Sequence, residues 1–481
     1  MTRKSGVLMH VSSLFGDFSS GAFGYEAEKF IDFLSDSGFG IWQTLPFCMP
    51  DEYNSPYKSY SSFGANPYFI DLNTLYKKGY ITGEELAAAR QNTPYLCEYT
   101  RLKTERVPLL KKAAERAKKD GTLVLEIEKF IEENPELLNA AKFLALKEIN
   151  GGKMWQDFTV SEPDEDTLFA WKFIQFEFYR QWFRIKEYAN RKGIKIIGDL
   201  PIYVALDSAD VWANPSDFLL DGDGFPTSVA GVPPDYFTED GQLWGNPLYD
   251  FKKMKSDGYL FWKKRINHAL KLFDGIRIDH FRAFEAFWAV PRDAKSAKEG
   301  KWIKGPGKEI IKIIKDYAKD SLIIAEDLGD ITDGVRKLLD FSGLPGMRVL
   351  QFAFLGDENT PHLPHNFEKN TAVYSGTHDN NTLLGYVWEL DGNTRKKVFD
   401  YFGYHGEDFS EACRVIIKSL LACVADTVIF PIQDLLVFGS DTRMNTPGVS
   451  GGNWAYRVTE EQLNLVDRGK YRYLNNLYGR K

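Results

Sequence analysis

The stretch LFDGIRIDHFRAF, residues 272–284, places two charged side chains, Arg277 and Asp279, inside a run with the apolar character of a core β-strand. Successive side chains of a strand point to opposite faces, so Ile276 and Ile278 share an apolar face and the two charges share the other. A buried charge persists when it is paired, which leaves two interpretations open. The charges form either a structural ion pair at a strand end or part of a functional site at the carboxyl end of a barrel strand.

Seven further runs rich in β-branched residues have the same form and end in polar residues or glycine. Helical periodicity fills several of the gaps between them, for example in GKEIIKIIKDYAKD. Strands that alternate with helices predict a parallel sheet with right-handed crossovers, and eight units predict an α/β fold, a closed (β/α)8 TIM barrel. The eight expected strands lie within residues 6–14, 41–46, 194–204, 273–281, 321–329, 346–354, 371–379 and 426–436.

The chain, residues 1–481, is longer than a minimal barrel, and we expect a single catalytic domain with two insertions. Residues 75–165 are charged and largely helical in pattern, which predicts a helical insertion. Residues 205–250 are rich in Gly, Pro, Asp and aromatic residues with little periodicity, which predicts an active-site loop insertion. Within it, LLDGDGF begins like a calcium loop, but Phe225 stands where that pattern needs Asp or Asn, so we expect a turn and no metal.

The composition of the chain excludes some classes of binding partner and favours others. The net charge of −7 argues against nucleic acid or an anionic membrane surface as the main partner. The 15% aromatic content suits ligands that are partly apolar and partly hydroxylated. No segment has the pattern of a signal peptide or a membrane span, and no cysteine spacing fits a zinc site or a disulfide framework. We therefore expect a cytoplasmic protein with free thiols at Cys48, Cys97, Cys413 and Cys423.

Carboxylates recur where the expected strands end. Asp199 lies in the third strand, Asp279 in the fourth, Glu326 in the fifth and Asp379 in the seventh. The chemistry of such barrels lies at the carboxyl ends of the strands. Carboxylates that converge there repel each other, so we expect one to stay ionised with the help of Arg277 and another to be protonated. A carboxylate nucleophile opposite a carboxylic acid is the arrangement for retaining cleavage of a glycosidic bond.

Two histidines and four tryptophans are expected to be structural. In the strand register used above, His10 and His280 point away from the site. Trp244 stands apart because it lies in a glycine-flanked loop with no periodic pattern around it. Four tryptophans are expected to pack barrel helices or insertions: Trp42, Trp171, Trp182 and Trp262.

Several motifs resemble those of 4-α-glucanotransferases, also called amylomaltases or disproportionating enzymes, of glycoside hydrolase family 77. They include GIRIDHFRAFEAFWAVP, IIAEDLGDIT, GLPGMRVLQFAF, GTHDNNT and RMNTPGVSGGNWAYR. The resemblance runs from about residue 5 to about residue 457 and weakens only in the helical insertion. It implies a barrel with inserted subdomains and without the C-terminal β-domain of α-amylases, and only about 45 residues follow the eighth strand here.

The resemblance also implies roles for individual side chains. Asp279 matches the nucleophile that forms a covalent glucosyl-enzyme, and Glu326 matches the acid/base. Asp379 matches the carboxylate that supports the transition state, and Arg277 matches the arginine that holds the nucleophile ionised. Four positions match contacts to the substrate: Tyr57, Asp199, His378 and Asn445. Four more match a loop that folds over the site: Asp235, Tyr236, Gln242 and Trp244.

Three functions follow as hypotheses. The first is a 4-α-glucanotransferase of starch or glycogen metabolism, which moves α-1,4-glucan segments between maltooligosaccharides or to glucose by retaining double displacement, without a cofactor. The second is an α-amylase-type retaining hydrolase, with the same carboxylates and water as acceptor. The third is an inactive α-glucan-binding scaffold, which the presence of all three carboxylates disfavours. A loop that excludes water favours transfer over hydrolysis.

Overall fold

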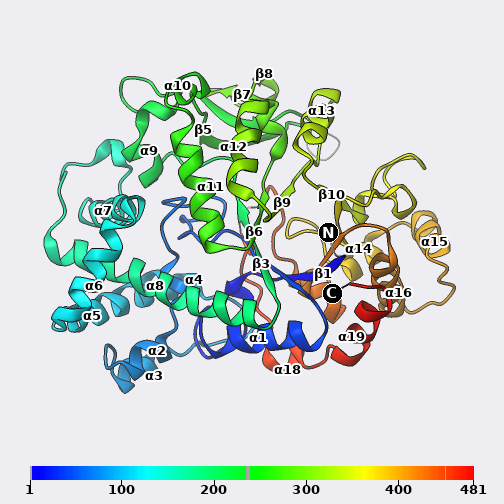
Figure 1. Cartoon of the computed structure of the whole chain (residues 1–481), viewed down its shortest axis with the longest axis horizontal. Helices are drawn as coiled ribbons and strands as arrows, with labels where there is room; N and C mark the ends of the chain where they lie inside the picture. The colour runs from blue at the N-terminus through cyan, green and yellow to red at the C-terminus, as the bar shows by residue number, and fades with distance from the viewer. Residues whose placement is uncertain (1–2, 235–238, 450, 481) are drawn as a thin grey trace.

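The computed structural model describes residues 3–234, 239–449 and 451–480. Eight parallel strands close into a barrel in the spatial order β1-β12-β11-β10-β9-β6-β3-β2. Figure 1 shows β1, β3 and β6 near the centre of the molecule. This arrangement confirms the (β/α)8 barrel, and every expected strand segment contributes one barrel strand. The strands are β1 (Lys4–Leu8), β2 (Ile41–Gln43), β3 (Lys195–Leu200), β6 (Gly275–Ile278), β9 (Leu322–Ala325), β10 (Gly346–Val349), β11 (Thr371–Tyr374) and β12 (Thr427–Pro431).

The barrel closes where its first strand meets its last. β1 pairs with β2 on one side and with β12 on the other, in a register that joins Lys4 to Thr427. Arg480 is 1% exposed and fastens this seam. Its Nη1 donates to the carbonyl of Lys4 and to that of Ala425, both at 3.1 Å. A guanidinium has five N–H donors in a rigid fork, so it can satisfy several carbonyl groups at the seam at once.

Amphipathic helices cover the outside of the barrel. In α12 (Lys308–Ala318) the buried residues are Ile310, Ile311, Ile314 and Ala318, which form a single stripe at helical spacing. Trp42, Trp182 and Trp262 are fully buried, and burying a side chain of this size contributes roughly 1.5–3 kcal/mol. Other covering helices are α1 (Tyr25–Asp36), α8 (Glu165–Arg191), α11 (Leu260–Leu272), α13 (Asp333–Ser342), α14 (Leu383–Glu389) and α16 (Phe409–Ala422).

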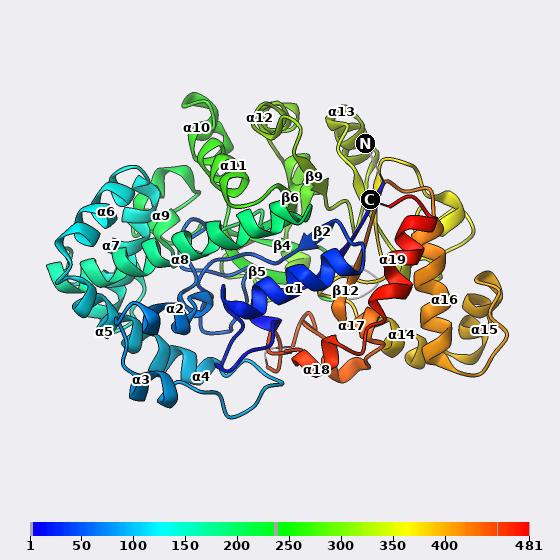
Figure 2. The ribbon, with the colours of Figure 1, turned by 60° about the horizontal axis from the view of Figure 1, so that its bottom comes forward.

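The charged segment at 75–165 forms helices that lie at one end of the molecule. Figure 2 shows them in blue to cyan, with the helices of residues 107–149 around the first half of α8. α8 packs against α5, α6 and α7, so a long barrel helix anchors the insertion. The helices are α3 (Gly83–Ala88), α4 (Tyr99–Arg101), α5 (Val107–Ala117), α6 (Gly121–Glu132) and α7 (Pro135–Ile149).

A second, antiparallel sheet was not anticipated. Its strand order is β5-β4-β7-β8. The segment 205–250 therefore contains strands, although its sequence has little periodicity. The pairing of β4 with β7 joins parts of the chain on either side of β6, and such long-range pairing leaves little trace in a short segment. The strands are β4 (Ser228–Val232), β5 (Gln242–Pro247), β7 (Ala286–Pro291) and β8 (Lys301–Lys304).

The chain after the barrel is helical. From residue 432 to 480, apart from residue 450, it adds no strand to either sheet. It forms α17 (Ile432–Leu436), α18 (Glu460–Leu463) and α19 (Arg468–Leu477). Within the described ranges, no helix combines the length and the apolar character needed to cross a bilayer.

Candidate active site

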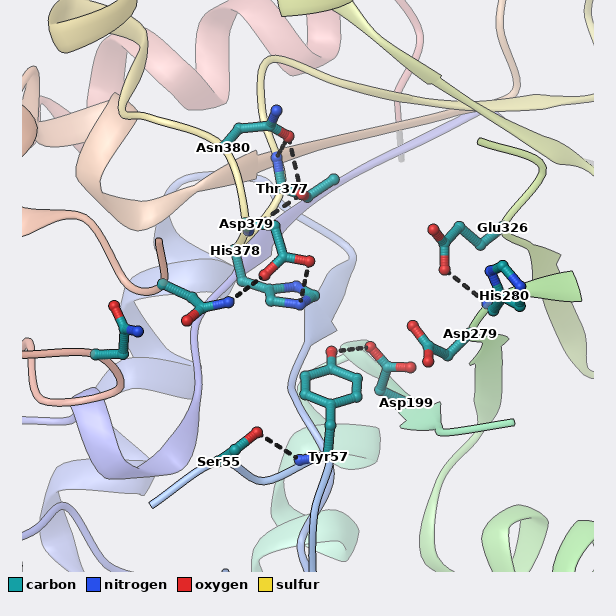
Figure 3. Close-up of polar contacts among 12 residues, drawn as sticks. Ser55, Tyr57, Asp199, Asp279, His280, Glu326, Thr377, His378, Asp379 and Asn380 are labelled. Carbon is teal, nitrogen blue, oxygen red and sulfur yellow. Dashed lines mark hydrogen bonds and ion pairs between the residues drawn. The ribbon is translucent and has the colours of Figure 1, made fainter. Parts of the chain in front are cut away.

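A cleft of about 600 Å³ opens beside the carboxyl ends of the barrel strands. Its wall contains three of the four predicted carboxylates, and the fourth, Asp199, accepts a hydrogen bond from the hydroxyl of the cleft residue Tyr57 (Figure 3). Asp235 and Tyr236 lie outside the described residues. The other predicted site residues that line the cleft are Tyr57, Gln242, Trp244, Asp279, Glu326, His378, Asp379 and Asn445.

Arg277 joins three carboxylates at the base of the cleft. Its Nη1 donates to Asp199 Oδ2 at 2.6 Å and lies 3.2 Å from Asp279 Oδ1. Its Nη2 donates to Glu326 Oε2 at 2.7 Å. Arg277 is only 3% exposed, so these charges interact in a poorly solvated environment. The charges of the opening stretch are therefore both a structural ion pair and part of a functional site, because Arg277 pairs with Asp279 and Glu326, which line the cleft.

The environments of Asp279 and Glu326 push the pKa values of these two carboxyls in opposite directions. Burial, together with the negative charge of Glu326, raises the pKa of Asp279 well above its usual range. Burial also disfavours the charge of Glu326, but Arg277 and the backbone N–H of His280 outweigh it and lower that pKa. Arg277 lowers the pKa of Asp279 against the effect of burial, so its role in holding this carboxyl ionised stays a prediction. Glu326 has the shorter contact to Arg277 and also accepts from the N–H of His280 at 2.7 Å, and both contacts favour its ionised form.

Asp379 is held as an anion by its neighbours. Asn445 Nδ2 donates to its Oδ1 at 2.6 Å, and His378 Nε2 lies 3.3 Å from its Oδ2. Burial alone would raise the pKa of Asp379, but His378 and the hydrogen bond from Asn445 lower it to about 2. This carboxylate is therefore ionised at neutral pH, as a group that stabilises a developing positive charge must be.

An aromatic cluster forms the wall of the cleft next to these groups. The Tyr57 hydroxyl donates to Asp199 Oδ2 at 2.7 Å, and the Tyr57 ring stacks on His378 with centroids 5.0 Å apart. Trp454 completes the cluster at 5.9 Å from Tyr57 and 5.8 Å from His378. Trp454 was not among the predicted residues, although it lies in the GGNWAYR motif that supported the family resemblance.

His280 was predicted to point away from the site, and this prediction is wrong. β6 ends at Ile278, and His280 adopts the left-handed conformation with φ 50° and ψ 50°, so the alternation of a strand does not extend to it. Its ring lines the cleft and meets Trp244 edge to face, with centroids 4.8 Å apart. His10, in contrast, is buried 3.3 Å from the Thr44 hydroxyl and does not line the cleft.

The described part of the predicted covering loop belongs to the antiparallel sheet. Gln242 and Trp244 lie on β5, and Trp244 Nε1 donates to Gln242 Oε1 at 3.1 Å. The Trp244 ring therefore stands between the sheet and His280, beside the cleft.

The strand-end segment that carries His378 and Asp379 is fixed by Asp434, which the sequence did not single out. Ser375 Oγ donates to Asp434 Oδ2 at 2.6 Å, and the N–H of Leu383 donates to Oδ1 at 2.7 Å. A single carboxylate thus holds both ends of the segment. Burial raises the pKa of Asp434 to about 6.

The LLDGDGF segment forms the expected turn. Asp221 accepts the N–H groups of Asp223 and Phe225 and forms an ion pair with Arg292 at 2.9 Å, so its carboxylate is already occupied. In the described part of the chain, no group of three or more His, Cys, Asp or Glu residues is arranged to hold a metal ion.

A parallel (β/α)8 barrel with paired carboxylates in a cleft at the strand ends defines a class of enzymes that act on glycosidic bonds. Comparison with known proteins identifies the family. The family model described as 4-alpha-glucanotransferase matches residues 9–463. The 4-alpha-glucanotransferase of Synechocystis sp. is 40% identical over 501 residues, which cover 100% of this chain and 98% of that protein. The 4-alpha-glucanotransferase of Streptococcus pneumoniae serotype 4 is 39% identical and covers 96% and 94%.

Structural comparison gives the same result. The amylomaltase from Streptococcus agalactiae, solved in complex with acarbose, superposes with a TM-score of 0.95 at 36% identity, covering 99% of each chain. The amylomaltase from Corynebacterium glutamicum, at 18% identity and a TM-score of 0.82, shares the fold. The chain belongs to the 4-α-glucanotransferase family, which confirms the resemblance seen in the sequence.

Proposed function

We propose that this 4-α-glucanotransferase moves α-1,4-glucan segments from one maltooligosaccharide to another or to glucose, with Asp279, Glu326 and Asp379 as its catalytic carboxylates. The observation that carries the proposal is the convergence of these groups on one cleft around Arg277. The family relationship supports the reaction type. The amylomaltase solved with acarbose supports an oligosaccharide ligand. A cytoplasmic location and a role in starch or glycogen metabolism remain part of the proposal.

Two displacements at the anomeric carbon account for the reaction. In the first, Asp279 attacks the anomeric carbon while Glu326 gives its proton to the glycosidic oxygen, so the carbon–oxygen bond breaks and the reducing-end fragment leaves. The glucosyl-enzyme ester remains on Asp279. In the second, the 4-hydroxyl of an acceptor attacks that carbon and returns its proton to Glu326, which frees Asp279. Two inversions give net retention. Asp379 binds sugar hydroxyls and stabilises the positive charge that develops on the ring.

This sequence requires the proton of the carboxyl pair to be on Glu326, whereas the unliganded cleft favours Asp279. A donor substrate supplies the physical means to move it. Protonated Glu326 can donate a hydrogen bond to the glycosidic oxygen, but it cannot donate to Arg277 or to the N–H of His280. Positive charge that develops on the sugar ring also favours ionised Asp279. We therefore infer that substrate binding shifts the proton from Asp279 to Glu326.

Transfer rather than hydrolysis requires that water be kept from the glucosyl-enzyme. Trp244 supports this because its ring lies beside the cleft against His280, whose backbone N–H contacts Glu326. A loop that closes there would exclude water from the glucosyl-enzyme. An acceptor sugar bound in the cleft would then be the nucleophile in place of water.

Incubation with maltotriose tests the proposed function. We expect glucose together with a ladder of maltooligosaccharides longer than maltotriose. Products that are only shorter than the substrate would identify a hydrolase instead. Asp279→Asn should abolish turnover. Retained turnover in that variant would show that Asp279 is not the nucleophile, and the absence of any turnover in the wild-type chain would favour the binding-scaffold hypothesis.

A further inference from the structure

The wall of the cleft next to Glu326 contains polar atoms that the fold leaves unsatisfied. Arg282 Nε, the Tyr203 hydroxyl and His280 Nε2 are buried without a hydrogen-bond partner among the described residues. All three side chains line the cleft. Buried polar atoms are normally paired, and a group of exceptions at one wall of a binding cleft indicates that a ligand completes the pairing.

Arg282 is the most informative of the three. It belongs to η6 (Phe281–Phe284), the 3-10 helix that follows the proposed nucleophile, and it is 3% exposed. Its guanidinium carbon lies 3.7 Å from the centre of the Trp302 ring, which fixes the plane of the group. Nη1 donates to the carbonyl of Asp330 at 2.6 Å and is 3.5 Å from its carboxylate. Only one of its three nitrogens therefore has a partner in the described chain.

Asp330 supplies the complementary group. Its side chain is 62% exposed and lines the same cleft, so its carboxylate is free to accept further hydrogen bonds. An arginine that can donate and a carboxylate that can accept, side by side, match two adjacent hydroxyls of a sugar ring. One hydroxyl accepts from the guanidinium and the other donates to the carboxylate.

The position of this pair in the cleft indicates which sugar it would bind. Glu326 delivers its proton to the departing sugar, so departing and accepting chains lie on its side of Asp279. Figure 3 shows Glu326 and His280 beside each other, with His378 and Asp379 across the cleft. His280 contacts Glu326 directly and would flank the first sugar. Arg282 and Asp330 line the same cleft but make no contact with Asp279 or Glu326 among the described residues, so they would meet a sugar further from the reacting bond.

We propose that Arg282 and Asp330 form a subsite for the second glucose of the acceptor chain, counted from the end that is joined. This subsite, which rests on the proposed function, gives the enzyme a preference for acceptors of two or more glucose units over free glucose. Trp302 has a positioning role, because it touches Arg282 and does not line the cleft.

Acceptor competition with a donor that needs no departing sugar tests the subsite. α-Maltosyl fluoride forms the glycosyl-enzyme and releases fluoride, which an electrode measures, and glucose or maltose then serves as acceptor. The quantity compared is kcat/KM for maltose divided by kcat/KM for glucose. We expect this ratio to fall about tenfold in Arg282→Lys and about threefold in Asp330→Ala, since the net contribution of a typical hydrogen bond spans this range. Asp330→Ala keeps the carbonyl that holds Arg282.

Arg292→Lys is the matched control. Arg292 also pairs with an aspartate, at the end of β7, but does not line the cleft. Its ratio should equal that of the wild type. A variant that is merely misfolded loses activity with both acceptors and keeps the ratio. A ratio within twofold of the wild type in both Arg282→Lys and Asp330→Ala overturns the subsite. A wild-type chain that releases no fluoride refutes the proposed function, and the subsite with it.

Discussion

Replacing Arg277 by methionine removes a cation shared by the buried carboxylate Asp199 and the partly buried carboxylates Asp279 and Glu326, and keeps most of the side-chain volume. In the wild type its nitrogens lie 2.6 Å from Asp199, 2.7 Å from Glu326 and 3.2 Å from Asp279. Removing one partner of a buried ion pair costs about 3–5 kcal/mol, because the remaining charge is left uncompensated. We expect the free energy of unfolding at pH 8 to fall by about this amount.

The loss should depend on pH in a defined direction. Burial already raises the pKa of Asp199 and of Asp279, and Arg277 opposes that rise, so these values go up further in Arg277→Met. A carboxyl whose pKa is higher in the folded than in the unfolded protein stabilises the fold at low pH and loses that contribution as the pH rises through the folded value. The deficit of the variant should therefore be smaller at pH 5 than at pH 8.

Urea unfolding of both proteins at the two pH values measures this difference. Arg277→Lys is the matched control, since it keeps one positive charge while losing the fork that reaches three carboxylates. Its deficit should be smaller at pH 8 and should vary less with pH. Transfer activity should fall at least about a hundredfold in Arg277→Met. A deficit below about 1 kcal/mol that is the same at both pH values would refute the shared-cation reasoning.

Three further predictions concern other parts of the site. Glu326→Gln should lose about 10²–10⁴-fold of its activity on maltotriose but still release fluoride from α-maltosyl fluoride, which needs no general acid, and Asp279→Asn should fail with both; the opposite pattern would exchange the two roles. Trp244→Ala should raise the ratio of reducing ends released to transfer products from maltotriose, and an unchanged ratio at lower total activity would mean that Trp244 only packs the loop. Asp434→Asn should gain stability relative to the wild type between pH 4 and pH 8, by at most roughly 3 kcal/mol, because a carboxyl with a pKa of about 6 in the fold is destabilising above that pH. Melting curves at the two pH values check this, and a deficit independent of pH would contradict it.

The barrel was predictable because each strand carries a local signal. A run such as IKIIGDL is apolar, β-branched and bounded by polar residues, and the barrel buries both of its faces. The antiparallel sheet was not predictable in the same way. β5, with the sequence QLWGNP, contains a glycine and a proline and is partly exposed, so it becomes a strand only through its pairing with β4.

The site residues also fall into two groups, those that a local strand pattern predicts and those that depend on contacts far along the chain. Asp199, Glu326 and Arg277 lie in or directly after barrel strands, so strand geometry placed them near one another. His280 follows the strand by two residues, where a left-handed backbone conformation ends the alternation on which its predicted direction depended. Asp434 acts through neutral donors on a distant segment, and a sequence carries no sign of such a contact.

The seam between β1 and β12 joins the first and the last strand of the barrel to be synthesised, so it can form only late in translation. β2 emerges soon after β1 and can pair with one of its edges, but β12 begins only at Thr427. At ~5–20 residues per second, the other edge of β1 waits about 20–80 s for its partner. Throughout that time the nascent chain presents an apolar strand edge that could pair with another chain. Arg480, which fastens the seam, emerges later still, so barrel closure is one of the last events of synthesis.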